Sequence, residues 1–537
     1  MKRYAQFVLF FISLTAFAQQ DAWVYFNGKL NAQQYLDNPL TMLSQRALDR
    51  RTNQSIALDI KDVPITQSYI DQIEAANGIA VMAKSKWLNA VHVRGSQSNI
   101  HALMALSFVS GVYFADRSLN APGKTAVEHP LRNVNKTMET TADFNYGNSL
   151  NQIQMLHGDV LHQQNYTGSG KIIAIMDGGY PGVNNAAPFA RLRENNQILG
   201  GYDYVNRNND FYGGISHGTM VLSTMGGYAD GQLVGTAPDA SYYLFITEDG
   251  NNETPLEESL WVEAAEEADR LGVDIINTSL GYSVFDNPAY DYTYDDMNGQ
   301  TTFISKGLEV AFTRGMICVV SAGNEGNKDW YYITTPADAT HALTIGAVNA
   351  SANYASFSSH GPSFDGRIKP DVAAQGQAAV LSTPAGVINT ASGTSFSGPI
   401  MAGMTASLWQ AFPDKSNAEI MQIIKESASI FNNPNDEIGY GIPDFSSALA
   451  NNLGVEKIVE KTIAVYPNPA VSVVTIVFPA GFQNGNIRFY NTLGQKMLQQ
   501  EISGKQSSIS LEHLNRGLYL YEIQSAGLNQ KGKLIKQ

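Results

Sequence analysis

The sequence predicts an α/β protein built on a parallel sheet with helices on both faces, flanked by two smaller domains. Residues 148–452 alternate apolar runs such as "KIIAIMD" and "MICVVSAGN" with helical stretches such as "PLEESLWVEAAEEADRLG". This β/α order favours a parallel sheet covered on both sides. Residues 22–118 follow the order of a small α+β unit, and residues 458–537 contain only short β-type runs, as in a β-sandwich.

Bulk composition excludes some classes of partner. The chain has 537 residues, which is too many for one core, and a net charge of -14. That charge argues against nucleic acid as a partner, because phosphate binding needs clustered Lys and Arg. The single cysteine, Cys318, allows no intramolecular disulfide, and in "MICVV" we expect it to be an inert core thiol.

The first residues resemble an export signal. Lys2 and Arg3 precede a short apolar stretch, and Ala16-Phe17-Ala18 provides a small-x-small cleavage pattern. We therefore interpret residues 1–18 as a signal peptide cut after Ala18, which predicts a secreted or cell-surface protein. The alternative, a membrane anchor, is disfavoured because the apolar stretch is short for a spanning helix.

The segment 19–120 has the pattern of a ferredoxin-like unit. The strand-like "AWVYF", "IAVMAKS", "NAVHVRG" and "GVYFA" are interleaved with two helical stretches, "PITQSYIDQIEAANG" and "SNIHALMAL". The order strand–helix–strand–strand–helix–strand is that of a split βαβ fold. Residues 121–147 are polar and lack periodicity, which indicates a linker and processing region.

Ser395, within "SGTSFSGP", is a candidate nucleophile that needs a base and an orienting acid. His217 opens "HGTMV", where a glycine permits close approach at a helix start. Asp177 ends a buried apolar strand, where an isolated charge is costly without a partner. Asp177, Leu280 and Asn324 all fall at the ends of predicted strands, the edge at which open α/β sheets bind ligands.

Together these motifs resemble a known family. Asp177-Gly178-Gly179, His217-Gly218-Thr219 and Gly393-Thr394-Ser395 occur in the order of the active-site motifs of subtilisin-like serine peptidases. One departure is Gly178, where that family has Ser or Thr, at a position that does no chemistry. The resemblance implies a subtilisin-like parallel sheet and an endopeptidase with an Asp177–His217–Ser395 triad, which acts through an acyl-enzyme.

The same resemblance implies further site residues. Asn324 would bind the oxyanion together with the Ser395 backbone N–H. Ser279, Leu280 and Gly281 would pair with the substrate backbone, while Ala322 and Gly323 would form the other wall of the primary specificity pocket. The chemistry requires no cofactor. Structural calcium is common in the family, but the sequence does not identify its ligands.

The insertion "DNPAYDYTYDDMNGQ", residues 286–300, is rich in Tyr and Asp. Three interpretations remain open: a calcium site built from carboxylates and carbonyls, a cover over the substrate cleft, and a solvated loop. It lacks the spacing of an EF-hand.

The flanking domains also resemble known companions of such peptidases. Residues 19–120 look like an inhibitory propeptide. The tail, with "VYPNP" and "LNRGLYLYEI", looks like the C-terminal sorting domain of proteins exported by type IX secretion. The implied partners are protein or peptide substrates, the chain's own propeptide and the export machinery, and we expect a monomer. A sandwich that binds carbohydrate or protein is the alternative for the tail.

The sequence thus predicts a secreted endopeptidase. The main alternative is a catalytically weak or inactive subtilase fold that serves as a surface adhesin or binding protein. A serine esterase is a third candidate.

Overall fold

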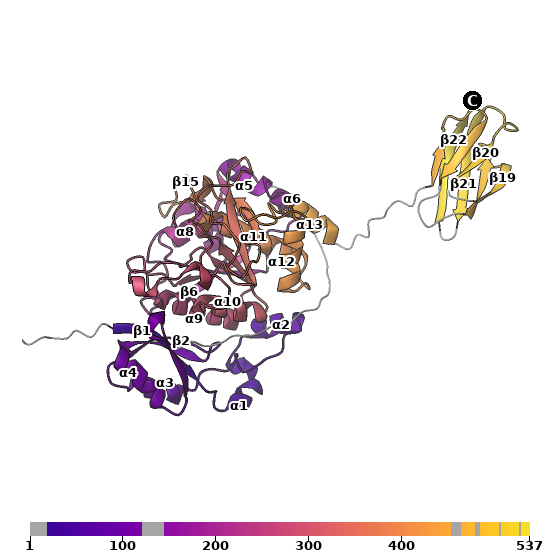
Figure 1. Ribbon diagram of the computed structural model, residues 1–537. Helices are drawn as coiled ribbons and strands as arrows, with labels where there is room; N and C mark the ends of the chain where they lie inside the picture. Colours follow the sequence, from indigo (N-terminus) through magenta and orange to yellow (C-terminus); the bar gives the residue numbers. More distant parts are fainter. Residues whose placement is uncertain (1–18, 121–143, 453–462, 478–483, 504–505, 526–527) are drawn as a thin grey trace, which may run out of the picture. The chain divides into compact units, whose positions relative to one another are not determined.

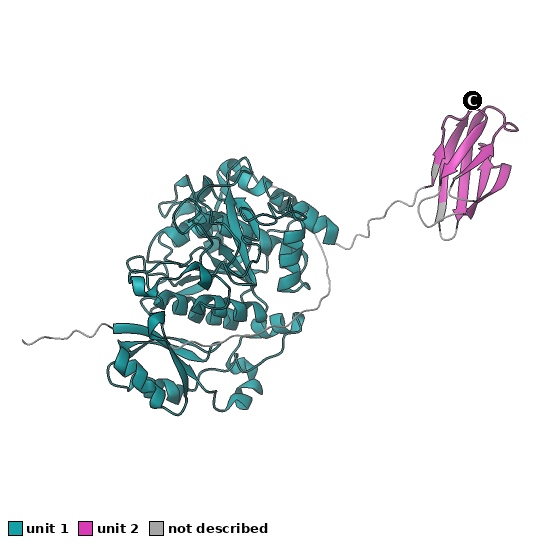
Figure 2. Cartoon of the chain, viewed as in Figure 1, with its two compact units in different colours: residues 1–452 teal, residues 453–537 magenta. Residues whose placement is uncertain are grey.

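The computed structural model describes residues 19–120, 144–452, 463–477, 484–503, 506–525 and 528–537. The chain forms two compact units, residues 1–452 and 453–537 (Figure 2). The expected signal peptide and most of the expected linker lie outside the described residues. None of the helices in the described part of the chain has the length and apolar character needed to cross a bilayer.

The N-terminal domain is built on a four-stranded antiparallel sheet with the order β2-β3-β1-β4. Its strands are β1 (Gln19–Phe26), β2 (Ile79–Ser85), β3 (Ala90–Ser96) and β4 (Val109–Phe114). Helix α3 (Gln67–Glu74) precedes β2 and α4 (Gln97–Ala102) follows β3. This order confirms the expected ferredoxin-like unit.

One segment of this domain was not expected. Between β1 and α3 the chain leaves the sheet and forms α1 (Ala32–Leu36) and α2 (Gln45–Asn53). The buried residues of α2 are Ala47, Arg50 and Arg51. Because this buried face is mainly charged, α2 lacks the apolar periodicity that predicts a helix from sequence.

A seven-stranded sheet with the order β13-β12-β11-β10-β5-β9-β6 forms the centre of the first unit, and its strand pairs are all parallel. Its strands are β5 (Ile172–Asp177), β6 (Ile198–Asp203), β9 (Ser241–Ile246), β10 (Ile275–Thr278), β11 (Ile317–Ser321), β12 (Ala342–Val348) and β13 (Val372–Gln375).

Helices cover both faces of this sheet. The longer ones are α8 (His217–Gly226), α9 (Leu256–Leu271), α10 (Phe303–Thr313), α11 (Thr394–Ala411) and α12 (Asn417–Glu426). Helices α9 and α10 lie between the seven-stranded sheet and the N-terminal sheet (Figure 1) and share one core with both, whereas α11 packs on β10 to β13. Cys318 is fully buried in β11, and burial raises the pKa of its thiol well above the usual range, which fits the predicted inert core thiol.

The N-terminal domain packs directly on α9 and α10. The Trp23 ring stacks on Phe303 with 5.1 Å between ring centroids, and its Nε1 donates to Ser259 Oγ at 2.8 Å. The Glu266 carboxylate of α9 accepts the backbone N–H groups of Lys86 at 3.0 Å and Trp87 at 2.9 Å. The domain is therefore held by specific polar contacts as well as by apolar burial.

The C-terminal unit contains two antiparallel sheets, with the orders β16-β17-β20 and β19-β18-β21-β22. Their strands are β16 (Ala464–Tyr466), β17 (Val473–Val477), β18 (Asn484–Tyr490), β19 (Lys496–Ser503), β20 (Gln506–Ser510), β21 (Gly517–Ser525) and β22 (Leu528–Lys536). One apolar core holds residues of both sheets, including Ile476 and Phe489, which confirms the expected sandwich.

Candidate active site

Asp177 and His217 form a hydrogen-bonded pair at the carboxyl end of β5. The His217 Nδ1 lies 2.8 Å from Asp177 Oδ1 and 3.0 Å from Oδ2. Asp177 is 2% exposed, and its Oδ1 also accepts the Gly178 N–H at 2.8 Å. A Cβ on Gly218 would lie 2.5 Å from the Gly179 carbonyl oxygen, so a glycine is needed there. This geometry leaves Nε2 of His217 available to accept a proton.

The environment of His217 makes its imidazole a stronger base. Burial by itself lowers the pKa of this group, but the charge of Asp177 and its hydrogen bond raise the pKa, and their combined effect is larger. The pKa of His217 therefore lies above its ordinary value.

Ser395 lies in the first turn of α11 and is half-buried. Its Oγ donates to the Ser279 carbonyl oxygen at 3.2 Å. The nearby Ser397 is fully buried and donates to the Thr394 carbonyl oxygen at 3.1 Å, so its hydroxyl has a structural partner. The ring of His217 lies 5.9 Å, centroid to centroid, from the Phe396 ring, which brings the histidine beside the start of α11.

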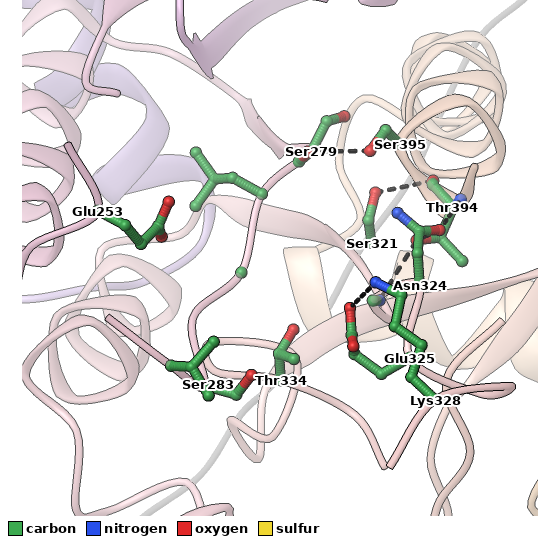
Figure 3. Close-up of a pocket in the computed structure, with 14 residues that line it drawn as sticks. Glu253, Ser279, Ser283, Ser321, Asn324, Glu325, Lys328, Thr334, Thr394 and Ser395 are labelled. Atoms are coloured by element: carbon green, nitrogen blue, oxygen red, sulfur yellow. Dashed lines mark hydrogen bonds and ion pairs between the residues drawn. The ribbon is translucent and has the colours of Figure 1, made fainter. Parts of the chain in front are cut away.

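Asn324 is oriented by Thr394. Its Oδ1 accepts the Thr394 backbone N–H at 2.8 Å and the Thr394 hydroxyl at 3.1 Å. Because Oδ1 is occupied in this way, the network assigns the opposite side of the amide to the Nδ2 donors. Asn324 and Ser395 line the same cavity (Figure 3).

That cavity has a volume of about 330 Å³. Its lining residues are Glu253, Ser279, Leu280, Gly281, Ser283, Val284, Ser321, Gly323, Asn324, Glu325, Lys328, Thr334, Thr394 and Ser395. Ser279, Leu280, Gly281 and Gly323, for which substrate contacts are predicted, are thus all among the lining residues. Ala322 is fully buried and is not among the lining residues.

Thr334 is a lining residue that sequence reasoning missed. It is 4% exposed, and its Oγ1 has no hydrogen-bond partner among the described residues. A Cβ built on Gly281 would lie 2.3 Å from this oxygen, and one on Gly323 would lie 3.1 Å from it. The hydroxyl therefore lies between Gly281 and Gly323, at distances that a larger residue at Gly281 would not allow. Nothing in "YYITTP" signals this, because the arrangement depends on three separate loops.

Carboxylates gather beside the same cavity. Those of Glu248, Glu253 and Glu257 lie within 4.8 Å of one another, and Glu253 also lines the cavity. Burial raises the pKa of Glu248 to about 8 and that of Glu257 to about 10. Oxygen donors of this kind suit calcium, but these raised pKa values mean that protons compete with a cation for the group.

The Tyr- and Asp-rich insertion contacts the N-terminal domain. Asp296 forms an ion pair with Arg117, and the Asp291 carbonyl oxygen accepts from Arg117 Nη2 at 3.1 Å. The guanidinium of Arg117 also lies 5.6 Å from the Tyr292 ring centroid. None of the three interpretations made from the sequence included this role.

Comparison with known families identifies three parts of the chain. Residues 21–131 match the Peptidase S8 propeptide domain of Bacteroidota. Residues 168–441, slightly over half of the chain, match the Subtilase family, and residues 464–537 match the secretion system C-terminal sorting domain. These matches confirm the three-part architecture that the resemblance implied, and the sorting domain indicates secretion or a cell-surface location.

Several characterised proteins are similar to the central part of the chain. Subtilisin E of Bacillus subtilis (strain 168) is 28% identical over 286 residues, which cover 52% of this chain and 66% of Subtilisin E, just under two thirds of its length. Serine protease AprX of the same strain is 29% identical over 296 residues, covering 50% of this chain and 63% of AprX. The crystal structure of MycP1 from Mycobacterium smegmatis is 22% identical with a TM-score of 0.43, covering 59% of this chain and 89% of that chain.

Proposed function

Because this chain belongs to the subtilase family, we propose that it is a secreted serine endopeptidase that hydrolyses peptide bonds through Asp177, His217 and Ser395. The observation that carries this proposal is the hydrogen bond from His217 Nδ1 to the buried Asp177, with the His217 ring 5.9 Å from that of Phe396, the residue that follows the cavity-lining Ser395. This arrangement supplies a base, an orienting acid and an accessible hydroxyl.

The chemistry follows from these roles. Ser395 Oγ attacks the peptide carbonyl carbon while His217 Nε2 takes its proton, and the carbonyl oxygen becomes an oxyanion. Collapse of this intermediate breaks the C–N bond, and His217 returns the proton to the leaving amine. Water then attacks the acyl-enzyme, with the same histidine first as base and then as acid. Asp177 keeps the proton on Nδ1 and stabilises the imidazolium.

The oxyanion would be held at the start of α11. We assign the Nδ2 group of Asn324 and the backbone N–H of Ser395 as its donors. Ser395 lies in the first turn of an 18-residue helix, where the helix dipole favours negative charge. Ser279, Leu280 and Gly281 would pair with the substrate backbone as an added strand, a step that would displace the present Ser395–Ser279 contact.

Replacing Ser395 tests the proposal. Ser395→Ala should lower kcat/KM on a protein substrate by at least ~10³-fold, because the nucleophile is lost. Ser392→Ala is the matched control: Ser392 is exposed and close in sequence, and should retain activity. A fluorescent serine-directed phosphonate should label the wild type and not Ser395→Ala. Labelling with ester hydrolysis but no proteolysis would indicate an esterase, and no labelling would indicate the adhesin.

The remaining partners belong to the same proposal. The N-terminal domain acts as the chain's own propeptide, type IX machinery exports the protein, and the active form is a monomer. The group Glu248, Glu253 and Glu257 is the place at which structural calcium would bind. The domain boundaries proposed from the sequence, with cleavage within 121–147, also stay a prediction.

A further inference from the structure

Helix α2 of the N-terminal domain lies at the C-terminal ends of two helices of the catalytic domain. These are α9, which ends at Leu271, and α10, which ends at Thr313. The last carbonyl groups of an α-helix have no partner within the helix and carry partial negative charge. A segment that brings donors and cations to such ends can therefore stabilise them.

Helix α2 supplies such donors to the end of α9. The Ser44 N–H donates to the Arg270 carbonyl oxygen at 2.9 Å. Arg46 Nε donates to the Gly272 carbonyl oxygen at 2.9 Å, and Arg50 donates to that of Val273. Gly272 ends the helix at φ 84, where glycine is favoured.

The same helix reaches the end of α10. Arg50 Nε donates to the Arg314 carbonyl oxygen at 3.2 Å, and Gln54 Nε2 donates to that of Gly315 at 2.9 Å. Gln54 Oε1 in turn accepts the Asn417 N–H at 3.0 Å. Helix α2 and the residue that follows it thus contact the C-terminal ends of α9 and α10 and the start of α12.

Buried ion pairs reinforce these contacts. Arg51 lies 2.7 Å from Asp269 and 2.9 Å from Asp62, and Arg50 is also paired with Asp269. Arg314 of the catalytic domain forms an ion pair with Asp62 of the N-terminal domain at 3.2 Å. Each of these five side chains is at most 4% exposed. Removing one partner would leave a buried charge without compensation in the docked state, so loss of either arginine should weaken docking strongly.

These contacts lie at the edge of the sheet formed by the amino ends of its strands, whereas the proposed active site lies at the edge formed by the carboxyl ends. The residues after α9 and α10 lead directly into β10 at Ile275 and β11 at Ile317, so α2 binds at the amino ends of these strands. Ser279 and Asn324 follow the carboxyl ends of the same strands. A five-residue strand such as β11 separates the two edges by roughly 16 Å.

We infer that residues 31–63 form an arginine clamp, a docking module that holds the N-terminal domain to the catalytic domain independently of the substrate cleft. The clamp binds through the face of α2 that carries Arg46, Arg50 and Arg51. The surface that it binds on the catalytic domain consists of the C-terminal ends of α9 and α10. Cutting the chain between the two domains does not free the N-terminal domain, because the clamp remains in place. This inference rests on the proposed function only in so far as the protein itself is the protease that cuts the chain within residues 121–147.

The experiment separates the clamp from the protein's own activity. A recognition site for an added protease is inserted between residues 121 and 143 of the full chain carrying Ser395→Ala. After cutting, dilution and gel filtration measure how fast the N-terminal domain leaves. The test variant is Arg50→Ala/Arg51→Ala. The control is Gln45→Ala/Asp49→Ala, which changes the exposed side of the same helix, where the two side chains contact each other.

The N-terminal domain should leave the test variant at least ~10-fold faster than the control, since lost interface contacts act mainly on dissociation. If the test variant does not fold, Gln54→Ala carries the test, since Gln54 is neutral and its removal leaves no buried charge unpaired. Equal dissociation rates in the control and in these variants would overturn the inference. Failure of the proposed function would appear separately, as absence of proteolysis in the wild type.

Discussion

Thr394 connects the two halves of the proposed catalytic machinery. Its backbone N–H and hydroxyl hold Asn324, and its carbonyl oxygen accepts the hydroxyls of Ser321 and Ser397 at 2.8 and 3.1 Å. Since Ser395 is the next residue, the proposed nucleophile and the proposed oxyanion donor are fixed relative to each other before substrate binds. Such preorganisation is a main source of electrostatic catalysis.

The pH dependence of activity should reflect the Asp177–His217 pair. Protonated His217 cannot accept the Ser395 proton, so kcat/KM should fall as the pH drops through the His217 pKa. Because that pKa is raised, the midpoint should lie above the ordinary value of about 6.5. Asp177→Asn removes the charge that raises it, and should move the midpoint to lower pH while lowering the rate. pH–rate profiles of both proteins check this, and a midpoint that does not move would contradict it.

The Thr334 hydroxyl should influence which substrate side chain the enzyme prefers at the residue immediately N-terminal to the scissile bond. An apolar substrate side chain would leave this buried hydroxyl unpaired, whereas an amide could bond to it. Asn and Leu peptides have similar shapes, so their kcat/KM ratio isolates the effect. Thr334→Val should shift this ratio toward Leu by about tenfold, since the shape is kept and the hydroxyl removed.

The control is Thr334→Ser, which retains the hydroxyl and should keep the wild-type ratio. If Thr334→Val and the wild type gave the same ratio of Asn to Leu cleavage, the hydroxyl would have no role in selection.

Individual elements differ in how well the sequence predicts them. Strand β5 is a continuous apolar run ending in Asp177, so its type and end were both predictable. The role of Ser395 was inferred from a short motif and stays a prediction. Helix α2 was missed because Arg50 and Arg51 occupy its buried face, and their partner Asp269 is more than two hundred residues away in the chain. The contacts of Thr334 were missed for the same reason: they are nonlocal.

The insertion, residues 286–300, should be ordered by Arg117. Three groups contact this guanidinium: the Asp296 carboxylate, the Asp291 carbonyl and the Tyr292 ring. In the Ser395→Ala chain, Arg117→Ala should therefore increase hydrogen exchange across the insertion severalfold, because fewer contacts oppose local opening. Lys84→Ala, at an exposed position of β2, is the control. Unchanged exchange in Arg117→Ala would show that Arg117 does not order this segment.

At the level of the whole chain, the C-terminal unit is compact by itself and has its own core. Each unit therefore has the apolar burial needed to fold by itself. The matched sorting domain is the part of the chain associated with secretion. Its removal should affect export more than folding.

A chain ending at Asn452 tests this separation. It should retain the kcat/KM of the full chain within about twofold, since all site residues lie in the first unit. It should also fail to reach the medium, as measured by immunoblotting of cell and medium fractions beside the full chain. Normal secretion of the shortened chain, or loss of its activity, would contradict the assignment.

The N-terminal domain touches the catalytic domain at widely separated places, with α2 at the amino ends of β10 and β11 and Arg117 on the insertion that follows the carboxyl end of β10. With its sheet also packed on α9 and α10, it is a multivalent ligand of the rest of the chain. When one contact opens, the others keep the freed surface at an effective concentration of about millimolar, and the contact re-forms before the domain can diffuse away. Simple dilution of a cut precursor should therefore be a slow route to free enzyme. Degradation of the N-terminal domain itself would remove every point of attachment and make release irreversible.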